Sequence, residues 1–142
     1  MVYCRSESPD LTLVGNGNIE EEADPDSYNQ KAGMGFVQDI WPRISKRMPI
    51  LEEAEYFTGY AGLYTETPDQ HPVIDKVEGI DGLYICTGFS GHGFKEAPIV
   101  GIAVAELILD GQATSIDISP LRMGRFREGA LNEIGYAFRV IA

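Results

Sequence analysis

Gly88-Phe-Ser-Gly-His-Gly-Phe-Lys95 is the stretch that decides the local fold of this 142-residue chain. It joins a short apolar segment, Leu83–Thr87, to a longer apolar segment with helical spacing, Ala97–Leu109. The pattern predicts a strand, a glycine-rich turn and a helix in direct succession. Because glycine lacks a Cβ atom, another group can approach the backbone of such a turn within hydrogen-bonding distance. The start of the helix adds unpaired N–H groups and the positive end of its dipole, so the turn suits an anionic or carbonyl-rich group.

The glycine pattern alone leaves two interpretations open. Gly88, Gly91 and Gly93 do not follow G-x-G-x-x-G, and G-x-x-x-x-G-K-[ST] does not occur in the chain. Either the turn binds phosphate or another anion, with Lys95 as a fixed cation and His92 as a titratable ring, or it is an ordinary strand–turn–helix junction. Residues outside the turn are needed to choose between them.

The composition is typical of one soluble globular domain with its own core. The 22 acidic and 11 basic residues give a net charge of −11, which argues against a nucleic-acid partner and an anionic membrane surface. No signal peptide is recognised, and the longest apolar stretch, Pro98–Leu109, is too short to span a bilayer. We therefore expect a cytoplasmic protein with no nucleic-acid and no membrane partner.

The two cysteines, Cys4 and Cys86, lack the spacing of a metal site, and we predict no bound metal. Cys86 lies in an apolar strand and is interpreted as a buried small hydrophobic residue. A disulfide between the two is compatible with the sequence, which gives it no support.

The N-terminal half predicts a hairpin followed by a helix and a strand. Val2–Arg5 and Leu11–Val14 have the pattern of two paired strands. Gly35–Arg47 has helical spacing, with a kink or boundary expected at Pro42. Glu53–Leu63 is rich in Tyr and Phe and is predicted to be a strand.

The C-terminal half predicts two short strands and a long helix. Val73–Ile74 and Leu83–Ile85 are the strands, joined by a turn at Gly79–Gly82. The helix Ala97–Leu109 is apolar on nearly all sides, so we expect it to be almost surrounded, and Asp110-Gly111 ends it. The predicted class is α+β, with mostly antiparallel strands, two main helices and no βαβαβ series.

Two segments together resemble a known family. Gly62-Leu-Tyr-Thr-Glu-Thr-Pro-Asp-Gln-His-Pro-Val-Ile-Asp75 resembles the T-x-D-x-x-P-I-I segment of FAD-dependent amine oxidoreductases. Gly82–Pro98, continuing into Gly101 and Glu106-Leu107-Ile108, resembles the C-terminal flavin-contacting segment of the same enzymes. This is the D-amino-acid oxidase superfamily, and the likeness is greatest to sarcosine oxidases, monomeric or β subunit. It covers Val2 to Arg125 but only the C-terminal portion of a family member, which implies an incomplete piece of a larger fold.

The resemblance implies that the turn contacts the pyrimidine edge of the isoalloxazine ring of FAD. Its backbone N–H groups would stabilise negative charge there as a hydride equivalent arrives at the flavin. Lys95 matches a lysine that holds the substrate carboxylate, Tyr64 matches a tyrosine lining the same pocket, and His92 would pack or hydrogen-bond near the flavin. The implied cofactor-binding residues are Gly88, Phe89, Ser90, Gly91, His92, Gly93, Phe94 and Lys95.

Three departures from the family pattern shape the expectation. The dinucleotide-binding unit with G-x-G-x-x-G is missing, so we expect the chain alone not to hold FAD tightly and to need that N-terminal half or a separate subunit. Gly62 stands where monomeric sarcosine oxidases attach flavin to a cysteine, which implies noncovalent FAD. Thr12 and Leu13 stand where those oxidases carry their oxygen-activating lysine, so a dehydrogenase is as compatible as an oxidase.

The resemblance divides the chain into the end of a substrate domain (1–65), the end of an FAD-binding domain (66–118) and an unassigned tail (119–142). It implies oxidation of the C–N bond of a secondary amine or N-methyl amino acid such as sarcosine. The alternative is a non-catalytic fragment or interaction module without FAD. Such a module would dimerise through apolar surface that the missing half would cover.

Overall fold

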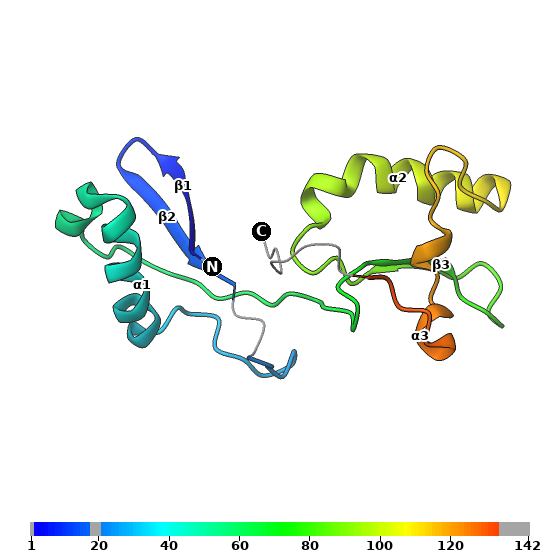
Figure 1. Cartoon of the computed structure of the whole chain (residues 1–142), viewed down its shortest axis with the longest axis horizontal. Helices are drawn as coiled ribbons and strands as arrows, with labels where there is room; N and C mark the ends of the chain where they lie inside the picture. The colour runs from blue at the N-terminus through cyan, green and yellow to red at the C-terminus, as the bar shows by residue number, and fades with distance from the viewer. Residues whose placement is uncertain (1, 18–20, 134–142) are drawn as a thin grey trace. The chain divides into compact units, whose positions relative to one another are not determined.

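The computed structural model describes residues 2–17 and 21–133 of the chain. These residues form two compact units, the first ending at Leu63 and the second beginning at Tyr64 (Figure 1). Each unit contains one two-stranded antiparallel sheet, and the described residues include three α-helices. The predicted α+β class, with antiparallel strands and two main helices, is confirmed.

The first unit is built on a hairpin and one helix. Strand β1 (Val2–Ser8) pairs antiparallel with β2 (Leu11–Asn16), as the sequence predicts. Helix α1 (Met34–Arg47) buries an apolar stripe, contacts both strands and continues through Pro42, so of the kink or boundary expected there the boundary is not observed. A proline within a helix removes one backbone hydrogen bond. Burial on both sides of it compensates, through Val37, Ile40 and Ile44.

The predicted strand Glu53–Leu63 is wrong. Its start belongs to the 3₁₀ helix η1 (Pro49–Glu53), and the rest is extended chain held by a single bridge between Lys31 and Tyr60. Phe57 and Tyr60 are exposed, so their strand propensity finds no sheet to pack on.

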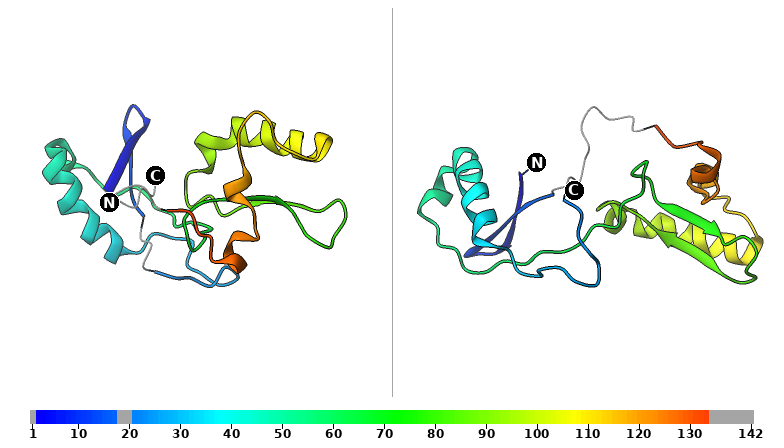
Figure 2. Two further views of the ribbon diagram at one scale, coloured as in Figure 1. Left: turned by 45° about the vertical axis from the view of Figure 1, so that its right-hand side comes forward. Right: turned by 90° about the horizontal axis from the view of Figure 1, so that it is seen from below.

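The second unit places a short ribbon of two strands beside a long helix (Figure 2). β3 (Val73–Lys76) pairs antiparallel with β4 (Tyr84–Thr87), with Ile74 opposite Cys86. Helix α2 (Gly93–Asp110) contacts β3. It begins four residues before the predicted start and ends, as predicted, at Gly111, whose φ of +79° is left-handed.

The described part of the tail belongs to this second unit. It contains the 3₁₀ helix η2 (Ser119–Leu121) and the short helix α3 (Arg125–Glu128). The Met123 N–H donates to Asp75 Oδ2 across 2.8 Å. Because Asp75 and Ile74 point to opposite faces of β3, the tail and α2 lie on opposite faces of the ribbon (Figures 1 and 2).

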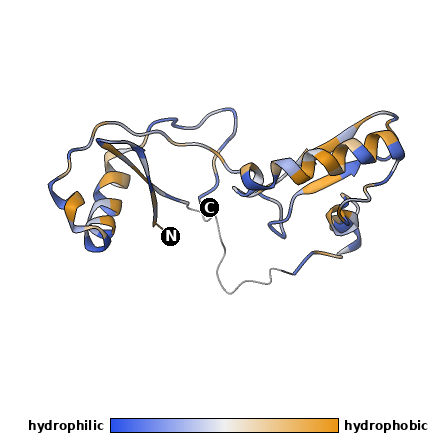
Figure 3. Ribbon diagram, turned by 90° about the horizontal axis from the view of Figure 1, so that it is seen from above, coloured by the Kyte–Doolittle hydropathy of each residue, from blue (hydrophilic) through white to orange (hydrophobic). Residues whose placement is uncertain are grey.

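Helix α2 is not surrounded, contrary to the prediction. Ala103 is its one buried residue, although the helix is apolar along most of its length (Figure 3). Cys86 is also exposed, not buried, because its face of β4 looks onto an open groove beside α2. Both Cys4 and Cys86 are free thiols. Within the described residues no helix has the length and apolarity to cross a membrane.

Candidate functional site

The turn between β4 and α2 has an unusual backbone that glycine makes accessible. Gly88 and Gly91 have φ of +74° and +84°, in the left-handed region that a Cβ atom disfavours. Ser90 lies there too, with φ of +49°. Its side chain is buried, its Oγ lies 3.4 Å from Gly88 O, and its N–H donates to Thr65 O across 3.1 Å. The surroundings therefore hold the turn in a conformation that the residue itself does not favour.

A second contact fixes the turn against the segment that contains Thr65 and Thr67. A Cβ atom added at Gly88 would lie 2.5 Å from Thr67 Cγ2. One at Gly93 would lie 3.0 Å from the Phe89 side chain. Gly88 and Gly93 are thus needed for close approach within the protein itself, which answers part of the question that the sequence left open.

The turn also presents backbone donors. No described residue accepts a hydrogen bond from the N–H groups of Gly91, Gly93 or Phe94. The last two groups belong to the first turn of α2, where intrahelical acceptors are missing and the helix dipole is positive. The turn can therefore donate to a carbonyl-rich or anionic group that approaches it.

The side chains predicted to act at this turn differ in how far they are exposed to solvent. His92 is the N-cap residue of α2, and its Nδ1 lies 3.2 Å from Phe89 O. Lys95 is exposed in the first helical turn, and Phe94 is 98% exposed. Tyr64 is partly exposed and directly precedes Thr65, the acceptor of the Ser90 N–H.

The buried ion pair between Arg125 and Asp69 was not predicted from the sequence. Arg125 is fully buried, and its Nε and Nη2 atoms donate to the two carboxylate oxygens of Asp69 at 2.7 and 2.9 Å. Burial alone would raise the pKa of Asp69, but hydrogen bonds from Arg125 and from the backbone N–H groups of Asn132 and His71 hold that pKa well below its usual range. Asp69 is the aspartate of the T-x-D-x-x-P-I-I segment, but no local signal in the sequence links it to an arginine 56 positions later.

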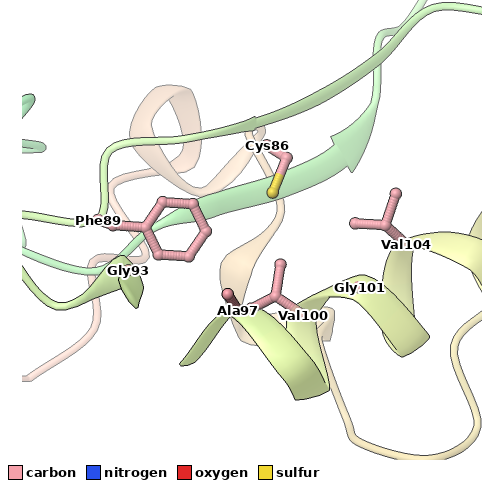
Figure 4. Close-up of a pocket in the computed structure, with 7 residues that line it drawn as sticks. All are labelled: Cys86, Phe89, Gly93, Ala97, Val100, Gly101 and Val104. Carbon is pink, nitrogen blue, oxygen red and sulfur yellow. The ribbon is translucent and has the colours of Figure 1, made fainter. Parts of the chain in front are cut away.

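An open apolar groove of about 450 Å³ lies between β4 and α2 (Figure 4). Cys86 faces it from the strand and Ala97, Val100 and Val104 face it from the helix (Figure 4). Phe89, Gly93 and Gly101 complete its lining. Such a groove suits an apolar chain segment better than a charged ligand. Among the described residues, no group of three or more His, Cys, Asp or Glu side chains is arranged to hold a metal ion.

Known proteins resemble this chain over most of its length. Residues 1–107 match the family model of FAD dependent oxidoreductases named DAO. The bovine FAD-dependent oxidoreductase domain-containing protein 1 is 38% identical over 129 residues, which are 89% of this chain and 26% of that protein. Human peroxisomal sarcosine oxidase is 34% identical over 122 residues, 84% of this chain and 31% of that protein.

One solved structure has the same fold over nearly the whole chain. L-proline dehydrogenase from P. horikoshii superposes with a TM-score of 0.77 at 33% identity, covering 92% of this chain and 34% of that one. The chain thus spans about a quarter to a third of the length of these relatives. Its strand, glycine turn and helix are one part of a larger oxidoreductase fold. The chain belongs to the DAO family of FAD-dependent oxidoreductases.

Proposed function

We propose that this chain supplies the C-terminal part of a flavoenzyme that oxidises the C–N bond of a secondary amine or N-methyl amino acid. In this proposal the turn Gly88–Lys95 contacts the pyrimidine edge of noncovalently bound FAD. Lys95 holds the substrate carboxylate, and Tyr64 lines the same pocket. The observation that carries the proposal is a glycine turn that leads into a helix, in a chain of an FAD-dependent family, whose Gly91, Gly93 and Phe94 N–H groups have no acceptor among the described residues.

The residues of the turn fit the ring edge of a flavin. That edge is planar and rich in carbonyl groups, so it needs backbone donors and no intervening side chains. The donors of Gly91, Gly93 and Phe94 meet the first need, and the left-handed glycines Gly88 and Gly91 support the second. When bound, the flavin supplies the acceptor for two electrons. The role of this chain is to orient the ring and to favour negative charge along its edge.

The chemistry of the substrate is inferred from what the relatives share. Sarcosine and L-proline, named in two of them, are both secondary amines with a carboxylate on the adjacent carbon. Lys95, an exposed cation in the first turn of α2, is suited to bind that carboxylate. His92 would support the turn near the flavin, since its ring lies against the turn's own Phe89 carbonyl.

The partner of this chain, in our proposal, is the dinucleotide-binding half that the family resemblance implies, since the chain matches only about a quarter to a third of the length of its relatives. An apolar helix with one buried residue and an adjoining apolar groove are surfaces that need a cover. The same exposure favours the second candidate function, a non-catalytic module that lacks FAD when isolated and associates with a second copy of itself. The first candidate predicts a yellow complex with the dinucleotide-binding half, and the second predicts a colourless assembly of identical chains.

The experiment compares the purified chain with and without a separately produced dinucleotide-binding half of a homologous enzyme. The chain alone should remain colourless after addition of FAD and gel filtration. The mixture should elute as one yellow species, and sarcosine or L-proline should bleach the flavin band under anaerobic conditions while glycine, a primary amine, serves as control. A colourless mixture together with a homodimer of the chain would support the module instead. Peroxide formation against reduction of an artificial acceptor then separates oxidase from dehydrogenase.

A further inference from the structure

Arg125 uses every hydrogen-bond donor of its side chain inside the protein. Its guanidinium carries five N–H groups. Two donate to Asp69, one donates to His71 O at 2.7 Å, and two donate to the carbonyl oxygens of Leu121 and Arg122. A fully buried arginine with such a set has one rigid position, because any displacement leaves a charge or a donor unpaired.

Three of these hydrogen bonds, to Asp69 and His71, hold the short loop 67–71 in place. The Asp69 carboxylate accepts the His71 N–H at 3.2 Å, which closes the loop on itself. The Thr67 hydroxyl lies 2.7 Å from His71 O and bridges the loop from the other end. Arg125 therefore holds the loop at its carboxylate and at its last carbonyl.

The loop and the residue pair before it form the wall on which the glycine turn rests. Thr65 O accepts the N–H of Ser90, and Thr67 fills the space beside Gly88. Ser90 is the one non-glycine residue of the turn with a left-handed φ, and its buried position depends on that wall. None of the five hydrogen bonds of the Arg125 guanidinium reaches the turn, so its influence passes through Asp69 and the loop.

We infer that Arg125 is a positioning residue for the turn Gly88–Lys95, acting through Asp69 and the loop 67–71. The segment after α2 thereby sets the direction of the N–H donors that face the cofactor. The identification of that cofactor rests on the proposed function, whereas the mechanical coupling between Arg125 and Ser90 does not. Arg127 on the same short helix is the natural control, since it is exposed and pairs with Glu78 at 3.4 Å.

The decisive test is amide hydrogen exchange of the chain as it exists, without flavin. Arg125→Lys keeps the charge but cannot form the two parallel bonds to Asp69. We expect the Ser90 amide to exchange at least tenfold faster relative to the Ala103 amide in the middle of α2, with no change in Arg127→Ala. An unchanged ratio in a folded Arg125→Lys protein would overturn the inference.

If the variant fails to fold, a measurement on the unaltered protein tests the coupling between Arg125 and Ser90. The Ala130 N–H donates to Arg125 O at 2.9 Å and reports on the arginine's own segment. In low denaturant, the Ser90 and Ala130 amides should open together, with the same dependence on denaturant. If either amide opens while the other stays protected, the coupling is absent.

The flavin-loaded complex with the dinucleotide-binding half gives the functional readout. Arg125→Lys should shift the flavin absorbance band and its reduction potential, and Arg127→Ala should leave both unchanged. A loaded complex whose potential is the same in Arg125→Lys would refute the role toward the cofactor. If the unaltered chain binds no flavin in this complex, the proposed function fails, while the exchange experiment still judges the coupling.

Discussion

The backbone of Gly88 lies against Thr67 so closely that a Cβ atom at position 88 would be 2.5 Å from the threonine methyl carbon. This contact joins the end of β4 to the loop 67–71, two segments that lie about twenty positions apart in the chain. Together with the Ser90–Thr65 hydrogen bond, it connects the turn to a wall that Arg125 holds in place. The position of the turn is therefore set by the second unit as a whole.

Gly88→Ala should destabilise the second unit by about 2–5 kcal/mol. A left-handed conformation costs a non-glycine residue about 1–2 kcal/mol, and an overpacked contact adds about 1–3 kcal/mol. Urea unfolding monitored by circular dichroism measures the change. Gly62→Ala is the control, because nothing lies within 4 Å of a Cβ atom there, and it should alter the free energy of unfolding by less than about 0.5 kcal/mol. Equal effects of the two substitutions would contradict the argument.

Stability should fall in acid in a way that depends on Asp69. The folded protein holds the pKa of this carboxyl below its unfolded value of about 3.9, so ionised Asp69 stabilises the fold above that pH. The contribution is lost as the pH falls from about 4 towards the depressed folded pKa. Asp69→Asn should lower the free energy of unfolding by about 3–5 kcal/mol at pH 7, because it leaves the buried Arg125 without its counter-charge.

The measurement is urea unfolding of both proteins from pH 7 to pH 2.5. The difference between them should shrink as the pH drops, since protonation removes the same charge from the unaltered protein. Hydrogen bonds from the Ser115 hydroxyl and from the Ser115 and Thr114 backbone lower the pKa of Glu106 to about 2. That carboxylate adds acid sensitivity to both proteins equally. A difference that stays constant with pH would show that Asp69 is not ionised in the fold.

Lys95→Ala should raise KM for carboxylate substrates in the complete flavoenzyme by about 10- to 100-fold. A hydrogen bond to a charged group contributes about 1.5–3 kcal/mol, and each 1.4 kcal/mol corresponds to a factor of ten. Steady-state kinetics with sarcosine and with sarcosine methyl ester makes the test specific, because the ester lacks the charge and should lose little. Lys76→Ala, which removes an exposed lysine from β3, is the control. Equal KM values for Lys95→Ala and the unaltered enzyme would remove Lys95 from the substrate site.

Local pattern was sufficient for the elements closest to the site. The β3–β4 ribbon, the glycine turn, α2 and its end at Gly111 were all predictable, because each depends on residues adjacent in the chain. The four-residue error at the start of α2 arose because Gly93-Phe-Lys-Glu96 has too little apolar periodicity to mark a helix. The N–H donors that begin the helix therefore belong to the turn itself.

Long-range structure was not predictable in the same way. The Asp69–Arg125 pair joins positions 56 apart. Asp69 belongs to the T-x-D-x-x-P-I-I segment, but nothing near either residue indicates that the two are paired. The Glu53–Leu63 prediction failed for the related reason that strand propensity needs a partner strand, and that segment has a single bridge. The prediction that α2 is surrounded assumed that an apolar helix is covered by other parts of the chain. The described residues provide no such cover for it.

The apolar face of α2 should therefore contribute to association as well as to folding. Ile99 and Ile102 are 37% and 50% exposed, so replacing both with serine should lower the free energy of unfolding by about 2–3 kcal/mol through the parts already buried within the chain. Fully burying an isoleucine contributes about 1.5–3 kcal/mol, so covering the exposed parts of both contributes about 1–3 kcal/mol in total, and the double substitution should weaken binding of the dinucleotide-binding half by about 10- to 100-fold. Sedimentation velocity measures that affinity together with any self-association. Ile50→Ser, in the first unit and 76% exposed, is the control and should leave the affinity unchanged. Unaltered binding by the Ile99→Ser, Ile102→Ser chain would mean that another surface carries the interaction, since these two side chains lie on the face that now has no cover.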